Sequence, residues 1–415
     1  MEKGVFVDLF AGAGGLSEGF INSGFTPVAH VENDANASST LRTRMAYHYL
    51  EQENSLQFYY DYLLGNINNN RFYSEIPNEI LDTVINTEIK KENLTYIFKR
   101  IEKNLDAFSS KKVDVIIGGP PCQAYSLVGR ARDRYGMKND PRNYLYKMYA
   151  EFLKKFEPDL FVFENVIGLL SAAKGDLFRD VKEHFRNAGY ETDYEILNAR
   201  DFGVLQNRRR VILIGWKRGM KMHYPEFTPR NGKYLVKDIF QDLPKIKPGE
   251  MEEQTGYIAR PTEYLKRSNI RKPSDILTQH ISRNNNETDK EIYRRAIILW
   301  NSEKKRLHYT DLPLEYRTHK NVESFLDRFK VVADELPYSQ TVVSHIAKDG
   351  HYYIHPDLSQ LRSISVRESA RLQAFPDSYY FEGSRTSAFN QIGNAVPPLM
   401  ANSIADALSN LLWSA

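Results

Sequence analysis

The strongest constraint on the fold is the alternation of apolar runs, a glycine-rich turn and an amphipathic segment near the start of the chain. Residues 4–10 (GVFVDLF) predict a buried strand, residues 11–15 (AGAGG) interrupt it, and residues 16–24 predict a helix that ends at a glycine. Residues 25–34 (FTPVAHVEND) predict a second strand. Strand, helix and strand in this order form a β-α-β unit, which indicates a parallel sheet and an α/β fold.

The same alternation predicts four segments of chain. Residues 1–216 are expected to form a doubly wound, mostly parallel sheet with helices, interrupted by a helical insert at about 45–112 that carries no assignable motif. Residues 217–361 are richer in Pro, Asn and charge, which predicts a smaller irregular domain. Residues 362–387 predict a hinge, and residues 388–415 predict a C-terminal helix that returns to the first domain.

Composition excludes several classes of protein. The chain is 41% apolar and 26% charged, which is typical of a globular protein, and no segment approaches the roughly 18 apolar residues of a membrane span. The N-terminal residues predict no secretory signal. One cysteine excludes an internal disulfide and a multi-cysteine zinc site, so we expect no metal and a reducing cytoplasmic setting.

Charge is distributed unevenly along the chain. Residues 217–335 contain 24 Lys and Arg against 18 Asp and Glu, a net charge of +6, whereas the whole chain carries +3. A basic segment joined to a slightly acidic remainder is typical of a nucleic-acid-binding surface, although a solvated mixed-charge surface would look similar.

The glycine turn and the acid after it indicate a nucleotide-type cofactor. Gly12, Gly14 and Gly15 stand where the first strand turns into a helix, and glycine lets a backbone approach a ligand closely. Glu32 ends the next strand, where an acid can accept hydrogen bonds from ribose hydroxyls. Ser17 replaces the third glycine of G-x-G-x-x-G, which disfavours a dinucleotide redox site. A tight turn whose glycines serve packing alone is the alternative.

The lone thiol, Cys122, follows a predicted strand, two glycines and two prolines. Prolines stiffen the loop, and the carboxyl end of a parallel strand is where α/β enzymes bind ligands. A nucleophile is therefore favoured over a packing cysteine. No histidine stands in a setting that would indicate a protease-like Cys-His pair.

Six blocks resemble the DNA cytosine carbon-5 methyltransferase family, in the order and approximate spacing of that family. They are DLFAGAGG, GGPPCQAYS, FENV, QNRRR, RESARLQAFP and QIGNAVPP. The resemblance covers most of residues 5–40, 113–216 and 362–410 and implies a Rossmann-like methyltransferase domain. The basic middle segment then corresponds to the variable target-recognition domain.

The resemblance implies covalent catalysis. Cys122 as thiolate would add to carbon 6 of cytosine and activate carbon 5 for methylation. Glu164 would protonate ring nitrogen 3, which requires burial to raise its pKa. Arg210 would hold the cytosine carbonyl, and Arg208 would support the acid and the loop.

The resemblance also implies S-adenosylmethionine as the methyl donor, with S-adenosylhomocysteine as its product. The family pattern for cofactor contacts carries over to Phe10, Gly12, Ala13, Gly14, Gly15, Glu32, Asn33, Pro121, Leu145, Asn394 and Val396. An aspartate that contacts the adenine amino group in the family should lie between Glu32 and Val113, where we assign none.

For DNA, the resemblance implies contacts from Gln123, Ser126, Gln206 and Thr341, with the target base flipped out of the duplex. The Thr341 assignment rests on a two-residue match, and a β-hairpin around Asp349 and Gly350 is the alternative for that stretch.

The favoured interpretation is a monomeric DNA methyltransferase acting on double-stranded DNA and paired with a restriction endonuclease in a prokaryotic cell. A tRNA cytosine methyltransferase on the same scaffold, a non-catalytic DNA-binding subunit and a nicotinamide-dependent oxidoreductase are the alternatives. The middle segment is longer than in eukaryotic members that act on tRNA, and the intact Cys122, Glu164 and Arg210 set argues against a non-catalytic subunit.

Overall fold

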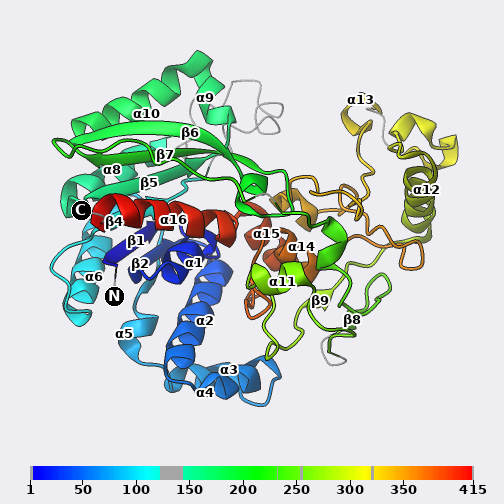
Figure 1. Ribbon diagram of the computed structural model, residues 1–415, viewed down its shortest axis with the longest axis horizontal. Helices are drawn as coiled ribbons and strands as arrows, with labels where there is room; N and C mark the ends of the chain where they lie inside the picture. Colours follow the sequence, from blue (N-terminus) through cyan, green and yellow to red (C-terminus); the bar gives the residue numbers. More distant parts are fainter. Residues whose placement is uncertain (1–2, 122–143, 231, 253–255, 319–321, 414–415) are drawn as a thin grey trace. The chain divides into compact units, whose positions relative to one another are not determined.

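The computed structural model describes residues 3–121, 144–230, 232–252, 256–318 and 322–413. Within these ranges the chain divides into two units (Figure 1). Unit 1 comprises residues 1–202, 209–230 and 396–415, and unit 2 comprises residues 203–208 and 231–395. Each unit is therefore built from segments that are far apart in the sequence.

Unit 1 contains a seven-stranded sheet in the order β3-β2-β1-β4-β5-β7-β6. The strands are β1 (Val5–Leu9), β2 (Thr26–Glu32), β3 (Val84–Asn86), β4 (Val115–Gly118), β5 (Leu160–Asn165), β6 (Tyr190–Asn198) and β7 (Arg209–Lys217). β1 pairs in parallel with both β2 and β4, and only β7 runs antiparallel to its neighbours, β5 and β6. The expectation of a mostly parallel, doubly wound α/β sheet is confirmed.

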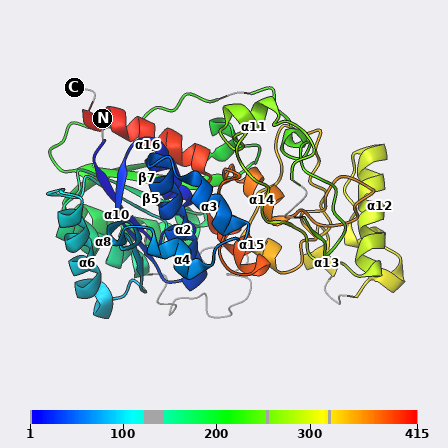
Figure 2. The ribbon, with the colours of Figure 1, turned by 90° about the horizontal axis from the view of Figure 1, so that it is seen from below.

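The helices of unit 1 cover both faces of this sheet. They are α1 (Gly15–Asn22), α2 (Ala35–Gln52), α3 (Leu56–Leu63), α4 (Asn69–Ser74), α5 (Asn78–Leu81), α6 (Leu94–Ala107), α8 (Leu145–Phe156), α9 (Gly168–Ser171), α10 (Asp176–Asn187) and α16 (Pro398–Trp413). In Figure 2, α16 lies on one side of the sheet and α6, α8 and α10 lie on the other. Successive side chains of β1 point to opposite faces of the sheet. Val5, Val7 and Leu9 join the core with α6, α8 and α10 on one face, whereas Phe6 packs on Phe20 of α1 on the other.

The C-terminal helix α16 packs directly against α1. Gly19 of α1 allows this contact, because a Cβ at Gly19 would lie 2.3 Å from the backbone nitrogen of Asn402. Asn402 also donates a hydrogen bond from its side chain to the Ser23 hydroxyl at 2.7 Å. The last helix of the chain is thus part of the same core as the first.

Strand order reverses between β1 and β4, so their carboxyl ends form a topological switch point, where open α/β sheets bind ligands. The glycine turn of residues 10–15 follows β1, and the Gly-Pro-Pro sequence that precedes Cys122 follows β4. Gly118 pairs with Leu9, and a Cβ on Gly118 would lie 2.4 Å from the Leu9 carbonyl oxygen. Glycine is therefore required where the two strands end.

Unit 2 has little regular structure in its described part, as the sequence predicts for its middle segment. Its elements are β8 (Met251–Glu252), β9 (His280–Ile281), α11 (Glu263–Arg267), α12 (Glu287–Glu303), α13 (Val322–Phe325), α14 (Val366–Leu372), α15 (Arg385–Asn394) and the 3-10 turns η5 (Val236–Ile239), η6 (Tyr309–Asp311), η7 (Leu314–Tyr316) and η8 (Ser344–Ala347). The hairpin that we considered around Asp349 and Gly350 is wrong, because no strand lies between η8 and α14 in this fully described stretch.

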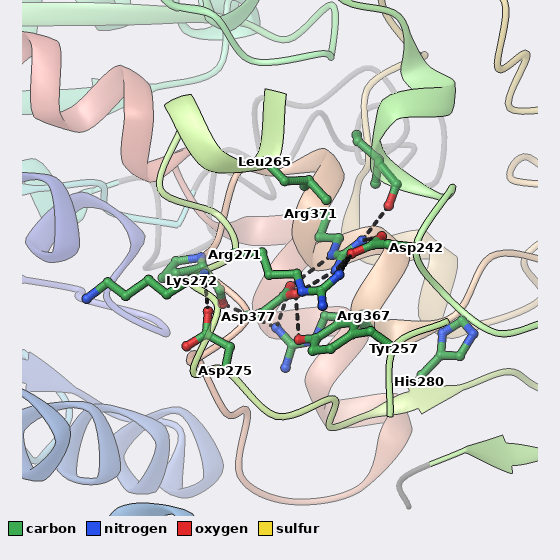
Figure 3. A network of polar contacts seen from close by, with 12 residues as sticks. Asp242, Tyr257, Leu265, Arg271, Lys272, Asp275, His280, Arg367, Arg371 and Asp377 are labelled. Carbon is green, nitrogen blue, oxygen red and sulfur yellow. Dashed lines mark hydrogen bonds and ion pairs between the residues drawn. The ribbon is translucent and has the colours of Figure 1, made fainter. Parts of the chain in front are cut away.

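A buried network of charged side chains holds much of unit 2 together (Figure 3). Arg371 of α14 forms ion pairs with Asp242 and Asp377, both at 2.6 Å, and all three side chains are fully buried. Arg271 also contacts Asp242, and its guanidinium lies 3.4 Å from the centre of the Tyr257 ring. One arginine of the RESARLQAFP block thus joins three separate segments of the chain.

Candidate active site

The turn after β1 has an unusual backbone conformation. Phe10 has a φ of 58°, which is rare for a bulky residue, and Gly12 and Gly14 have φ values of 54° and 79°. Gly14 caps the N-terminus of α1, and its amide donates to the Ala11 carbonyl at 2.9 Å. Apart from its two chain neighbours, no atom of the described residues lies within 4 Å of the position that a Cβ on Gly12 would occupy. This turn therefore presents an open, strained loop at the switch point, and such strain is typical of ligand sites.

Glu32 at the end of β2 is connected to this turn. Its Oε2 accepts a hydrogen bond from the Gly12 amide at 2.7 Å, and its Oε1 accepts one from the Asp34 amide at 2.7 Å. Burial raises the pKa of Glu32, and these amides oppose the rise. Asn33 is exposed beside it, and Asn86 at the end of β3 donates to the Glu32 carbonyl at 3.0 Å. The acid and the turn form one preorganised edge.

Asp8 is a feature of this region whose environment the sequence did not reveal. Its carboxyl is almost fully buried, accepts a hydrogen bond from Ser17 of α1, and leaves Oδ1 without a partner among the described residues. Burial raises the pKa of Asp8 to about 8, and the Ser17 hydroxyl opposes this rise. The position of an acid before the turn was visible in the sequence, but its burial depends on α1 packing over it.

The residues around the Cys122 loop are described as far as Pro121. Cys122, Gln123 and Ser126 lie outside the described residues. Pro120 is buried, Pro121 is exposed, and the Asn165 side chain donates to the Pro120 carbonyl at 3.3 Å. Asn165 of the FENV block therefore holds Pro120, two residues before the thiol, by a hydrogen bond.

Glu164 lies at the end of β5, next to this loop. Its side chain is nearly buried, with 12% exposed, and its Oε1 forms an ion pair with Nε of Arg210 at 2.8 Å. Its Oε2 faces Gly119, because a Cβ on Gly119 would lie only 2.6 Å from that oxygen. β5 and β7 pair antiparallel, which brings Glu164 and Arg210 together. Unit 1 thus combines an acid, a guanidinium and the start of the cysteine loop.

Arg208 occupies a different place from the one expected. It belongs to unit 2, is fully buried, and donates to the carbonyls of Val342 at 2.8 Å and Gly393 at 3.2 Å. The support of the acid that we expected from Arg208 is provided by Arg210 instead. The reason is that β7 begins at Arg209, so Arg210 belongs to the strand that pairs with β5, whereas Arg208 precedes the strand and belongs to unit 2.

Gln206 also differs from expectation. It is fully buried, donates to the Leu372 carbonyl at 2.9 Å, and accepts a hydrogen bond from the Val342 amide at 2.9 Å. A side chain held in the interior of unit 2 in this way does not fit the DNA contact that we predicted. Thr341 is half-buried, and its hydroxyl donates to the Asn207 carbonyl at 2.6 Å.

The remaining predicted cofactor residues lie as follows. Ala13 and Gly15 are buried in the turn and in the first position of α1, and Leu145 is half-buried at the start of α8. Asn394 is the exposed last residue of α15 in unit 2, and Val396 is a buried residue of unit 1.

Within the described ranges, no group of three or more His, Cys, Asp or Glu side chains could hold a metal ion. In the same ranges, no helix has the length and apolar character needed to cross a bilayer.

Comparison with known proteins defines the class of enzyme. The family model for C-5 cytosine-specific DNA methylases matches residues 5–58 and 66–410. The chain belongs to this family. It is a DNA (cytosine-5-)-methyltransferase, and its curated relatives are type II methyltransferases of restriction-modification systems.

Two of these relatives match almost the whole chain. The type II methyltransferase M.Bpa9945I of Bacillus paralicheniformis is 40% identical, over 98% of this chain and 99% of its own. The type II methyltransferase M.DdeI of Desulfomicrobium norvegicum is 32% identical, over 97% of this chain and 88% of its own.

Among solved structures, a prophage-encoded DNA modification methyltransferase from E. coli aligns with a TM-score of 0.64 at 22% identity, covering 98% of this chain and 99% of its own. The methyltransferase EhMeth of Entamoeba histolytica aligns with a TM-score of 0.52 at 12% identity, covering 100% and 99%. At these identities the likeness concerns the fold alone.

Proposed function

We propose that this enzyme transfers a methyl group from S-adenosylmethionine to carbon 5 of a flipped-out cytosine in a specific duplex DNA sequence, through a covalent Cys122 adduct. The observation that carries the proposal is the arrangement around Glu164. One carboxylate oxygen pairs with Arg210, and the other faces Gly119, three residues before the thiol. An acid held beside a nucleophile-bearing loop is what activation of a pyrimidine ring requires.

Each group has a defined task in this proposal. The Cys122 thiolate bonds to carbon 6, and the ring electrons move towards nitrogen 3, where Glu164 donates a proton. Arg210 fixes the carboxyl through Oε1 and is close enough to the acid to hold the cytosine carbonyl as well. After methyl transfer, nitrogen 3 returns its proton to Glu164, the proton on carbon 5 is lost to a base, and departure of the thiolate restores the aromatic ring.

The edge formed by the glycine turn and Glu32 fits an adenosine-type cofactor. Gly12 leaves open space among the described residues, Phe10 has a positive φ and a partly buried side chain, and Glu32 carries a half-buried carboxylate suited to ribose hydroxyls. When bound there, S-adenosylmethionine supplies an electrophilic methyl group. Glu88 follows β3 at the same edge, and we assign to it the adenine contact that the sequence left unassigned.

The other cofactor contacts that we propose are Ala13, Gly14, Gly15, Asn33, Pro121, Leu145, Asn394 and Val396. Unit 2 supplies target recognition and contacts DNA through Thr341, and Gln123 and Ser126 of unit 1 provide further DNA contacts. The type II relatives support a functional pairing with a restriction endonuclease, and we propose that the methyltransferase acts as a monomer.

The first test is chemical trapping. A duplex that carries 5-fluorocytosine at the target should form a denaturation-resistant adduct with the enzyme, because fluorine does not leave as a proton does. Cys122→Ser should form no adduct and transfer no methyl group while it still binds S-adenosylmethionine. Normal turnover by this variant would refute the covalent mechanism.

The second test separates the substrate classes and locates the target. Methyl transfer should occur on duplex DNA and not on tRNA, and bisulfite sequencing of DNA from an expressing host should report one recurring site.

A third test concerns the cofactor. Glu32→Ala should weaken S-adenosylmethionine binding at least about tenfold, as measured by calorimetry, since it removes a pair of charge-assisted hydrogen bonds. An unchanged dissociation constant would reject the ribose assignment.

A further inference from the structure

Unit 2 contains a groove between the C-terminal end of α12 and the segment of residues 329–340. We call it the basic groove and define it by Asn207, Trp300, Arg306, Lys330, Tyr338 and Gln340. Its volume is about 220 Å³. A second hollow adjoins it, and Arg306 lines both. The groove therefore continues as a longer depression along one surface of unit 2.

Two cations of the basic groove lack the acidic partner that neighbouring cations have. Lys304 pairs with Glu335 at 2.6 Å, and Lys305 pairs with Glu303 at 2.9 Å. In the described part of the chain, by contrast, neither Arg306 nor Lys330 lies within ion-pair distance of a carboxylate. The groove thus has uncompensated positive charge at its lining.

The two cations also act on one another. Burial lowers the pKa of Lys330, and the charge of Arg306 lowers it further, while the smaller effect of Asp327 opposes the shift. The Lys330 ammonium lies 5.4 Å from the centre of the Tyr352 ring, which is a weaker form of compensation than a carboxylate. A protein that keeps two like charges together in a partly buried groove is best stabilised there by an anion.

The uncharged lining of the groove suits a nucleic acid. Asn207 and Gln340 carry amides, and Tyr338 and Trp300 carry rings with one polar edge each. The Asn207 amide donates a hydrogen bond to the Ser339 carbonyl at 3.0 Å, so the main chain connects the groove to the QNRRR block. Amide and hydroxyl side chains beside arginine and lysine are typical of phosphate and sugar contacts in protein–DNA complexes.

We infer that the basic groove binds the sugar-phosphate backbone of duplex DNA, with Arg306 and Lys330 each neutralising a phosphate. This inference rests on the proposed function, which makes duplex DNA the substrate. It goes further by naming the surface of unit 2 and the two residues that contact the backbone. Such contacts position the duplex and are independent of base sequence, so they form before the enzyme reaches its target site.

The test is the salt dependence of binding to a short random-sequence duplex. Arg306→Gln combined with Lys330→Gln should reduce the slope of log affinity against log salt by about 1.8, since each neutralised phosphate contributes about 0.9. At 0.1 M salt the affinity should fall about eightfold for each lost contact, which follows from that slope over one decade of salt. Emission from Trp300 should change on DNA binding in the wild type and not in the double variant.

Lys290→Gln is the matched control. Lys290 lies on α12, whose C-terminal end borders the groove, and is already paired with Glu287 at 2.8 Å, so this substitution removes one positive charge outside the groove. Its salt slope should stay at the wild-type value. A double variant with the slope of this control would overturn the inference. Thermal stabilisation by S-adenosylmethionine should be the same in all three proteins, which shows that they are folded.

Failure of the proposed function would look different. In that case the wild type would transfer no methyl group to DNA, whatever its salt slope. Methylation of DNA by the wild type, together with an unchanged salt slope in the double variant, would refute the inference about the basic groove and would not affect the proposed function.

Discussion

At the scale of single residues, the environment of Glu164 explains why the sequence motifs around it contain glycine and asparagine. Gly119 leaves room for the carboxylate, and Asn165 holds the Pro120 carbonyl. The sequence predicted the acid itself and the arginine two strands away. It could not predict which arginine meets the acid, because that depends on where β7 begins: Arg210 lies in the strand and Arg208 lies before it.

Gly119→Ala is expected to impair catalysis without affecting cofactor binding. The added methyl group would lie 2.6 Å from Glu164 Oε2, so the carboxyl must move away from the cysteine loop. Misplacement of a catalytic group by about 1 Å can cost roughly 100-fold in rate, so we expect a fall in kcat of at least about tenfold. Single-turnover methyl transfer measures it, and a wild-type rate would show that Oε2 is not the working oxygen.

Asp8→Asn is expected to change how stability depends on pH. The pKa of Asp8 is about 8 in the folded protein and near 3.8 when unfolded, so between these values the folded state holds a proton that the unfolded state has lost. The contribution of Asp8 to the free energy of unfolding is therefore present at low pH and is lost as pH rises through about 8. The variant should therefore melt above the wild type near pH 8.5, and this advantage should shrink towards pH 5.

Thermal melts in the absence of cofactor test this prediction. A difference in melting temperature that stays constant across the pH range would mean that Asp8 is ionised throughout.

At the scale of elements, hydrophobic pattern predicted the strands that are buried on both faces and missed those that are not. β1, β4, β5 and β7 each contain a buried, mainly apolar run. β6 alternates buried and exposed residues at the sheet edge, and β3 has three residues inside the insert that we expected to be helical. Short or half-exposed strands are defined by their partners in the sheet, which a single sequence does not reveal.

Gly19→Ala tests the contact between α1 and α16. A methyl group at Gly19 would meet the backbone of Ala401 and Asn402 at 2.3–2.4 Å, and backbone cannot be displaced as a side chain can. We expect a loss of about 1–3 kcal/mol in the free energy of unfolding, as for overpacked cores. Asn22→Ala, at the exposed end of the same helix, is the control and should leave the urea midpoint unchanged. Equal midpoints for both variants would mean that the helices do not pack this closely.

At the scale of the whole molecule, the RESARLQAFP block turns out to organise the interior of unit 2. Arg367 and Arg371 are both fully buried, and Arg371 pairs with Asp242, 129 residues away in sequence. The sequence identified this block through the family resemblance, but periodicity alone predicted only a helix. Buried charge cannot be foreseen from one sequence, because Arg and Asp are usually exposed.

Asp377→Asn is expected to destabilise unit 2 strongly. Burial alone would raise the pKa of Asp377, but the charges of Arg371 and Arg367, together with hydrogen bonds from Arg371 and Tyr257, outweigh it and keep the pKa below its ordinary value. Its contribution is present at neutral pH and is lost as pH falls through the folded pKa. Breaking a buried ion pair costs about 4 kcal/mol, so the urea midpoint should fall clearly.

The control for this prediction is Glu263→Gln, which breaks the exposed ion pair with Arg267. It should leave the midpoint unchanged. An equally small effect of Asp377→Asn would show that solvent reaches the network.

The polypeptide passes between the two units after residues 202, 208, 230 and 395. In the proposed function unit 2 carries target recognition, so a recombination event that exchanges this unit between related genes needs two crossover points, one near residue 230 and one before residue 396. A gene truncated after residue 230 would lose α16 and leave the packing surface of α1 uncovered. New DNA specificities in such enzymes are accordingly expected to arise by internal cassette exchange and not by fusion of a ready-made module to either terminus.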